Sequence, residues 1–179
     1  METLGHQTLE DRDNADYIEN NGPFKCTMKE AFLGEGYYFW ENNIDLAHIW
    51  GRVRYNGNYV ICDAKLNVDE LIFLDLLGNR NHQIYFQTII QKLGLKGRPI
   101  GKIIEFLKEL EKRPDKKGIF PFKIIRAVDS SKNVKDRLKF SDKRESYLNI
   151  NPVIIICLVE KNNLVLQAFK IIYPEAYFI

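Results

Sequence analysis

The chain has 179 residues, 45% of them hydrophobic and 28% charged, with a formal net charge of +2. This composition is typical of a globular domain and excludes a low-complexity or highly charged chain, so charge alone identifies no partner. The three cysteines, Cys26, Cys62 and Cys157, form no CxxC spacing, so we expect neither a disulfide framework nor a metal site. No signal-peptide pattern opens the sequence, and no apolar run reaches the roughly 18–20 residues of a membrane span. We therefore expect one cytoplasmic domain, residues 1–179, without membrane contact.

The N-terminal residues predict a helix followed by a strand. Residues 9–20 have helical spacing, with Thr8 as the N-cap and a stop at Asn21-Gly22-Pro23. Residues 36–40 are rich in aromatic side chains and predict a short strand.

A second helix and strand are predicted next. Asn43 can cap a helix that begins at Ile44 and ends near Trp50, with one apolar face. Asn56-Gly57 is typical of a tight turn, and residues 58–66 after it predict a strand.

The rest of the chain changes from helical to strand patterns. Helical spacing of apolar residues is found in three segments, 69–77, 82–93 and 99–112. Strands are then predicted at 120–128, 153–159 and 164–172, with residues 160–163 joining the last two as a hairpin. Strands at both ends indicate the α+β class. We expect residues 1–66 and 120–179 to form two packed sheets with a cleft between them, and residues 69–112 to be a peripheral helical insertion.

The most unusual stretch of the sequence is LGEGYYFW, residues 33–40, where four aromatic residues follow two glycines. Side chains alternate along a strand, so Tyr38 and Trp40 share one face, and two of the four aromatics are expected in the core. An aromatic face can stack on a flat cationic ring, and glycines let backbone groups approach it closely. The stretch therefore favours a site for a flat ligand.

The order of motifs over residues 5–51 resembles the ADP-ribosyltransferase superfamily, in its His-Tyr-(Glu) branch of poly(ADP-ribose) polymerases and bacterial mono-ADP-ribosyltransferase toxins. The matching pieces are His6-Gln7-Thr8, then LGEGYYFW, then a helix with an Ala-x-x-Trp pattern. The resemblance implies an ADP-ribosyltransferase-like split β-sandwich core. It also implies that the flat ligand is the nicotinamide of NAD, which is consumed as a substrate.

The resemblance assigns roles to individual positions. Tyr38 takes the place of the stacking tyrosine, and His6 that of the histidine that anchors a ribose. Gln7 stands where the family has a glycine whose backbone binds the nicotinamide amide, and Thr8 stands for the Ser/Thr that supports the pocket. Gly36 is expected near the base of the site, and Trp50 as its second aromatic wall.

The third catalytic position of the branch is a glutamate near the start of a late strand. Strand alignment places this position at Ile155, so the catalytic set becomes His6, Tyr38 and Ile155. Glu145 and Glu160 are the nearby acids that could instead supply the carboxylate. In the resembled family, loss of the glutamate accompanies transfer of a single ADP-ribose unit.

These residues lead to two hypotheses of different classes. The first is an enzyme: an NAD-dependent mono-ADP-ribosyltransferase, a transferase acting on a protein or nucleic acid, as a bacterial toxin or phage-defence effector. Under that hypothesis, an antitoxin or immunity protein is a further candidate partner. The second is a transfer-inactive module of the same fold that binds NAD or another nucleotide and acts through a partner. The Gln7 and Ile155 departures from the family pattern favour this second hypothesis.

Overall fold

The fold is seen in a computed structural model that describes residues 2–129, 137–162 and 164–177. Its helices and 3-10 turns are α1 (Ala15–Asn21), α2 (Ile44–Tyr55), η1 (Glu70–Ile72), α3 (Arg80–Lys92), α4 (Ile100–Glu111), η2 (Pro114–Lys116) and η3 (Glu175–Tyr177). Its strands are β1 (Glu2–Glu10), β2 (Tyr37–Glu41), β3 (Tyr59–Asn67), β4 (Phe73–Asp75), β5 (Ile124–Asp129), β6 (Arg137–Lys139), β7 (Tyr147–Asn149), β8 (Val153–Leu158) and β9 (Leu166–Tyr173).

Seven of the described strands form a single sheet in the order β4-β5-β8-β2-β1-β3-β9. All neighbours are antiparallel except β4 and β5, which are parallel. The α+β class is therefore confirmed. The expected pair of packed sheets is wrong, because hydrogen bonding joins both ends of the chain into one sheet.

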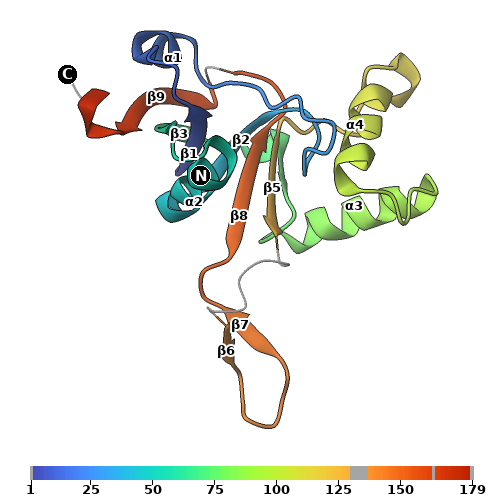
Figure 1. Ribbon diagram of the computed structural model, residues 1–179. Helices are drawn as coiled ribbons and strands as arrows, with labels where there is room; N and C mark the ends of the chain where they lie inside the picture. Colours follow the sequence, from blue (N-terminus) through green and yellow to red (C-terminus); the bar gives the residue numbers. More distant parts are fainter. Residues whose placement is uncertain (1, 130–136, 163, 178–179) are drawn as a thin grey trace.

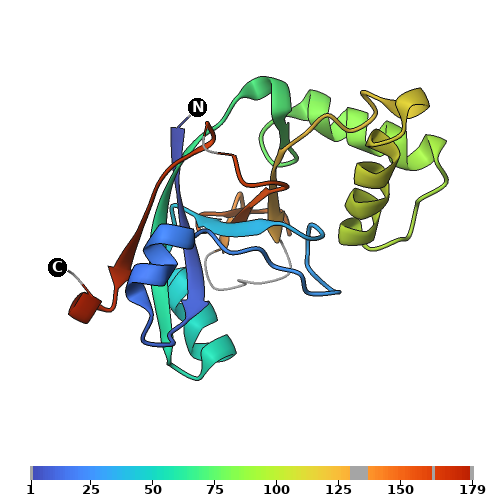
Figure 2. The ribbon, with the colours of Figure 1, turned by 90° about the horizontal axis from the view of Figure 1, so that it is seen from above.

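The sheet nearly divides between β1 and β2. Over the described residues, β1 pairs with β3 at nine positions, from Glu2 to Glu10, but with β2 only at Gly5 and His6. Beyond His6 the two strands part, and Figure 2 shows β1, β3 and β9 running across the direction of β2. Among the described residues, no strand pairs with this side of the second half of β1.

Helices cover both faces of the sheet. Ile18 of α1 packs on Val60 and Cys62 of β3, whereas Ala47 of α2 packs on Tyr59 and Ile61. Since successive strand residues point to opposite faces, α1 and α2 lie on opposite faces of the same strands. Helices α3 and α4 pack against the β4–β5–β8 part of the sheet, away from α1 and α2 (Figure 1).

The predicted N-cap of α2 is confirmed, but its predicted end is too early. The Asn43 side chain accepts a hydrogen bond from the backbone N–H of Leu46, as an N-cap does. The helix continues to Tyr55, further than the expected end near Trp50, and stops where Asn56 takes a left-handed conformation, with φ of 52°. This longer helix adds Arg54, four residues after Trp50, to the face that carries Trp50.

The helix expected at residues 9–20 is wrong over its first half. Residues up to Glu10 extend β1, where Thr8 pairs with Ile61 instead of capping a helix, and α1 begins only at Ala15. The nine-position pairing with β3 outweighs the weak local helical preference.

Two further predictions are corrected by pairing in the sheet. Residues 69–77, which were predicted as a helix, form a 3-10 turn and then β4, whose three residues are buried beside the parallel strand β5. A parallel strand is covered on both faces, so its residues do not show the alternation by which an exposed strand is recognised.

The predicted hairpin of residues 160–163, of which residue 163 lies outside the described residues, is also wrong. Strand β8 lies between β5 and β2, whereas β9 lies at the opposite edge beside β3.

Strands β6 and β7 form a separate hairpin that projects from the body of the molecule (Figure 1). It was not predicted, because each strand is only three residues long. None of the helices in the described part of the chain has the length and apolar character needed to cross a membrane.

Candidate functional site

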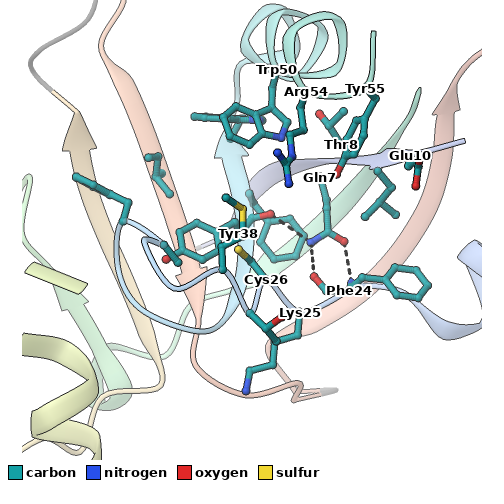
Figure 3. Close-up of a pocket in the computed structure, with 18 of the residues that line it drawn as sticks. Gln7, Thr8, Glu10, Phe24, Lys25, Cys26, Tyr38, Trp50, Arg54 and Tyr55 are labelled. Carbon is teal, nitrogen blue, oxygen red and sulfur yellow. Dashed lines mark hydrogen bonds between the residues drawn. The ribbon is translucent and has the colours of Figure 1, made fainter. Parts of the chain in front are cut away.

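A cavity of about 870 Å³ opens where β1 and β2 part. Its walls come from β1, β2 and β8, from α2 and from the loop between α1 and β2 (Figure 3). This volume lies near the upper end of the range of about 300–1,000 Å³ for small-molecule sites. Of the residues expected at the site, the cavity brings together Gln7, Thr8, Tyr38, Trp50 and Ile155.

The backbone of Thr8 faces this cavity. Asp11 donates its backbone N–H to Asn58 across the β1–β3 ladder, and the direction of these groups alternates along an antiparallel strand. Gln7 therefore directs its N–H and C=O at Cys62 of β3, and Thr8 directs its own away from β3, toward the gap. The resemblance assigned binding of the nicotinamide amide to the backbone of Gln7. In this geometry the backbone of Thr8 faces the gap and can take that role, whereas the backbone of Gln7 faces β3.

The Gln7 side chain spans the gap below the cavity. Its Nε2 donates to the carbonyls of Phe24, at 2.9 Å, and Tyr38, at 3.4 Å, while its Oε1 accepts from the N–H of Phe24 at 2.8 Å (Figure 3). One carboxamide thus replaces the strand pairing that is lost when β1 and β2 diverge. A glycine here would leave the partly buried backbone groups of Phe24 without these bonds.

Tyr38 forms a wall of the cavity and also anchors the loop before β2. Its hydroxyl donates to the carbonyl of Gly34 at 2.6 Å and accepts from the N–H of Leu33 at 2.7 Å. Burial raises the pKa of the Tyr38 phenol well above its usual value of 10. The hydroxyl therefore stays neutral and serves the fold, whereas the ring is the part that a ligand can touch.

The helix α2 supplies the opposite wall. Trp50 is 37% exposed, and its indole lies 6.0 Å from that of Trp40 at a tilted angle. The helix is held at this position by Thr8, whose hydroxyl donates to the carbonyl of Ala47 at 2.9 Å. Tyr38 and Trp50 thus present two aromatic side chains to one cavity from different elements.

His6 lies just behind the cavity wall and is not among its described lining residues. It is directly opposite Trp40 in the β1–β2 pairing, but its side chain is only 7% exposed. Its Nδ1 lies 2.6 Å from a carboxylate oxygen of Asp63 on β3. The imidazole is therefore held in the sheet by a charged partner.

Gly36 serves packing and does not line the described cavity. A Cβ at this position would lie 2.4 Å from the sulfur of Cys157 and 2.6 Å from the carbonyl of Leu158, both on β8. Its backbone also pairs with Cys26, which closes the base of the loop before β2. The glycine allows β2 and its preceding loop to approach β8 closely.

The late-strand position is occupied by Ile155, which lines the cavity and is 7% exposed. Glu145 and Glu160, the acids considered as alternatives, are both exposed and neither belongs to the described lining. Glu160 instead pairs with Lys123 at 3.1 Å. Asp129, at the end of β5 and one strand away from Ile155, is among the acidic residues that line the cavity.

Among the described residues, three cations line the cavity: Arg12, Lys25 and Arg54. Arg12 binds the Glu10 carboxylate through two nitrogens, and Lys25 pairs with Glu35 at 2.9 Å. The hydrogen bond that the Lys25 ammonium donates to the Glu35 carboxylate raises the pKa of Lys25. Arg54 has no described carboxylate within ion-pair distance, and its guanidinium points into the cavity beside Trp50 (Figure 3).

Comparisons with family models, with curated proteins and with solved structures found no match for this chain. Among the described residues, no group of three or more His, Cys, Asp or Glu side chains is arranged to hold a metal ion. Asp129 and Arg54 were not anticipated from the sequence. Neither belongs to a motif, and Arg54 lies beyond the predicted end of its helix.

Proposed function

We propose that this protein is an NAD-dependent mono-ADP-ribosyltransferase that modifies a protein or nucleic acid. The observation that carries the proposal is the cavity at the point where β1 and β2 part, which combines the Thr8 backbone with the rings of Tyr38 and Trp50. These residues come from the three motifs that resemble the family, and the folded chain gathers them around one space.

The geometry suits a nicotinamide ribosyl group. The two aromatic side chains offer electron-rich faces to the cationic ring, and the N–H and C=O of Thr8 match the acceptor and donor of its carboxamide. In the reaction, the bond between the ribose C1′ and the nicotinamide nitrogen breaks, and nicotinamide leaves as a neutral molecule with the bonding electrons. The acceptor forms a new bond to C1′ and releases its proton to a base, through a transition state in which the ribose is positively charged.

The lining also supports transfer of a single unit. The side chain of Ile155 can neither accept nor donate a hydrogen bond, so it cannot hold a ribose hydroxyl for chain elongation. The carboxylate of Asp129, on the same wall, is the group we expect to assist the acceptor. Asp129→Asn should therefore lower transfer more than it lowers NAD binding.

The experiment incubates the protein with NAD labelled in the adenylate and with a cell extract, then treats the product with protease or nuclease. Label that becomes acid-precipitable, and is released by only one of the two treatments, identifies transfer and the class of acceptor. Free labelled ADP-ribose alone would indicate hydrolysis without transfer. Failure to bind NAD in isothermal titration calorimetry would refute the proposal altogether.

A second candidate is a transfer-inactive module that binds NAD or another nucleotide. It is favoured by His6, which is bound to Asp63 and lies outside the described lining of the cavity. In this case, calorimetry should detect binding of NAD while the labelled extract stays free of product.

A further inference from the structure

The cations of the cavity differ in whether their charge is already neutralised. The Arg12 guanidinium is held by Glu10, which lines the same cavity, and Lys25 is held by Glu35. Arg54 is an exposed residue that lines the cavity without an ion pair to any described carboxylate. An arginine that faces a cavity in this way keeps its donors free for an incoming anion.

The position of Arg54 on α2 relates it to the aromatic wall. Arg54 follows Trp50 by four residues, so the two lie on the same face of the helix, about one turn or roughly 6 Å apart along its axis. Figure 3 shows the guanidinium directed into the cavity next to the indole, with Tyr55 and Glu10 beyond it. The cavity therefore changes from aromatic to cationic along α2.

We propose that Arg54 binds the pyrophosphate of the dinucleotide. This inference rests on the proposed function, because it places the nicotinamide between Tyr38 and Trp50. The next part of NAD after the nicotinamide ribose is the pyrophosphate, which then lies one helical turn further along α2, within reach of the Arg54 guanidinium. A planar guanidinium with several donors suits a phosphate better than a flexible ammonium does.

The test compares Arg54→Gln with Arg52→Gln, which removes the same charge from the same helix at an exposed residue outside the described cavity lining. Calorimetry measures the affinity of each variant for NAD, ADP-ribose and nicotinamide. For Arg54→Gln we expect the Kd of NAD and of ADP-ribose to rise about 10-fold or more, as for loss of a hydrogen bond to a charged group. The Kd of nicotinamide, which has no phosphate, should be unchanged, and Arg52→Gln should behave as the wild type.

The outcomes distinguish this inference from the proposed function. If the wild type binds NAD and Arg54→Gln binds it equally well, the role of Arg54 is refuted and the function stands. An equal loss of affinity for NAD and ADP-ribose in Arg54→Gln and Arg52→Gln would also refute the role of Arg54, because a general charge effect would then explain the result. If the wild type binds ADP-ribose in an Arg54-dependent manner but neither NAD nor nicotinamide, the anion site stands and the proposed transferase fails. Circular dichroism spectra of all variants should coincide, which excludes unfolding as the cause.

Discussion

The two walls of the cavity are built in different ways. On the sheet wall, Thr8 and Ile155 are each 7% exposed, and the Tyr38 hydroxyl is used twice in holding a loop. On the helix wall, Trp50 is 37% exposed and Arg54 has no described carboxylate partner. The sheet wall thus belongs to the core of the protein, whereas the side chains of the helix wall contribute little to the stability of the fold. Substitutions on the two walls should therefore affect stability and binding to different extents.

The largest expected effect is that of Ile155→Ala on stability. This side chain is buried among the residues that pack β8 against α3 and α4, so its truncation should lower the free energy of unfolding by about 2–5 kcal/mol. Urea denaturation followed by circular dichroism measures the change. Ile154→Ala, at a half-buried position on the other face of the same strand, is the control and should lower the free energy of unfolding clearly less. Equal decreases at the two positions would show that Ile155 does not belong to the core.

Tyr38→Phe separates the two roles of one side chain on the sheet wall. Loss of the hydroxyl leaves the N–H of Leu33 and the carbonyl of Gly34 without their partner, at a cost of about 1–3 kcal/mol in unfolding free energy. The ring remains, so the Kd of NAD should stay within a few-fold of the wild-type value. Tyr38→Ala, measured in the same titration, should abolish NAD binding. A Tyr38→Phe variant that binds NAD as poorly as Tyr38→Ala would show that the hydroxyl contacts the ligand.

The same hydroxyl makes the sheet wall sensitive to alkaline pH. Burial raises the pKa of Tyr38, so the folded protein keeps the phenol neutral at a pH where the unfolded chain ionises it, near its ordinary value of about 10. Above that pH the unfolded state binds fewer protons than the folded state, and stability falls as the pH rises. Urea denaturation at several pH values from neutral to alkaline should show this fall. The fall should be smaller in Tyr38→Phe, and an identical pH dependence would contradict the assignment.

Trp50→Ala tests the helix wall, where we expect binding to change more than stability. The half-exposed indole should contribute about 1 kcal/mol or less to the free energy of unfolding, whereas its loss removes one aromatic face from the ligand. The Kd of NAD should rise about 10-fold, which corresponds to the energy of an aromatic contact. Ile49→Ala, at the neighbouring exposed position of α2, is the matched control and should leave the Kd unchanged.

The smallest effects are expected at Glu145 and Glu160. Both are exposed and outside the described lining of the cavity, so Glu145→Gln and Glu160→Gln should leave transfer from labelled NAD unchanged. Loss of the Glu160–Lys123 pair should have little effect on stability, as is usual for an exposed ion pair. Abolished transfer in either folded variant would show that a carboxylate from outside the described cavity lining reaches the reaction.

Local patterns in the sequence were sufficient for several elements. The Asn43 cap, the turn at Asn56-Gly57 and the aromatic strand β2 are set by neighbouring residues, and each was predicted close to its observed position, whereas the end of α2 was predicted too early. The amphipathic helices α3 and α4 were also recognised, because apolar spacing at helical period is a local property. Of the residues that the motifs placed at one site, Thr8, Tyr38 and Trp50 line the cavity, whereas His6 and Gly36 are outside its described lining.

Tertiary pairing decided the rest. The sequence alone could not show that residues 2–10 are a strand, because that strand exists through its pairing with β3. Nor could it show which backbone groups face the gap, since a shift of one residue in register exchanges Gln7 and Thr8. The burial of His6 beside Asp63 and the presence of Asp129 and Arg54 at the cavity depend on contacts between elements far apart in the chain. Such contacts leave no local pattern, because they arise only when the sheet has formed.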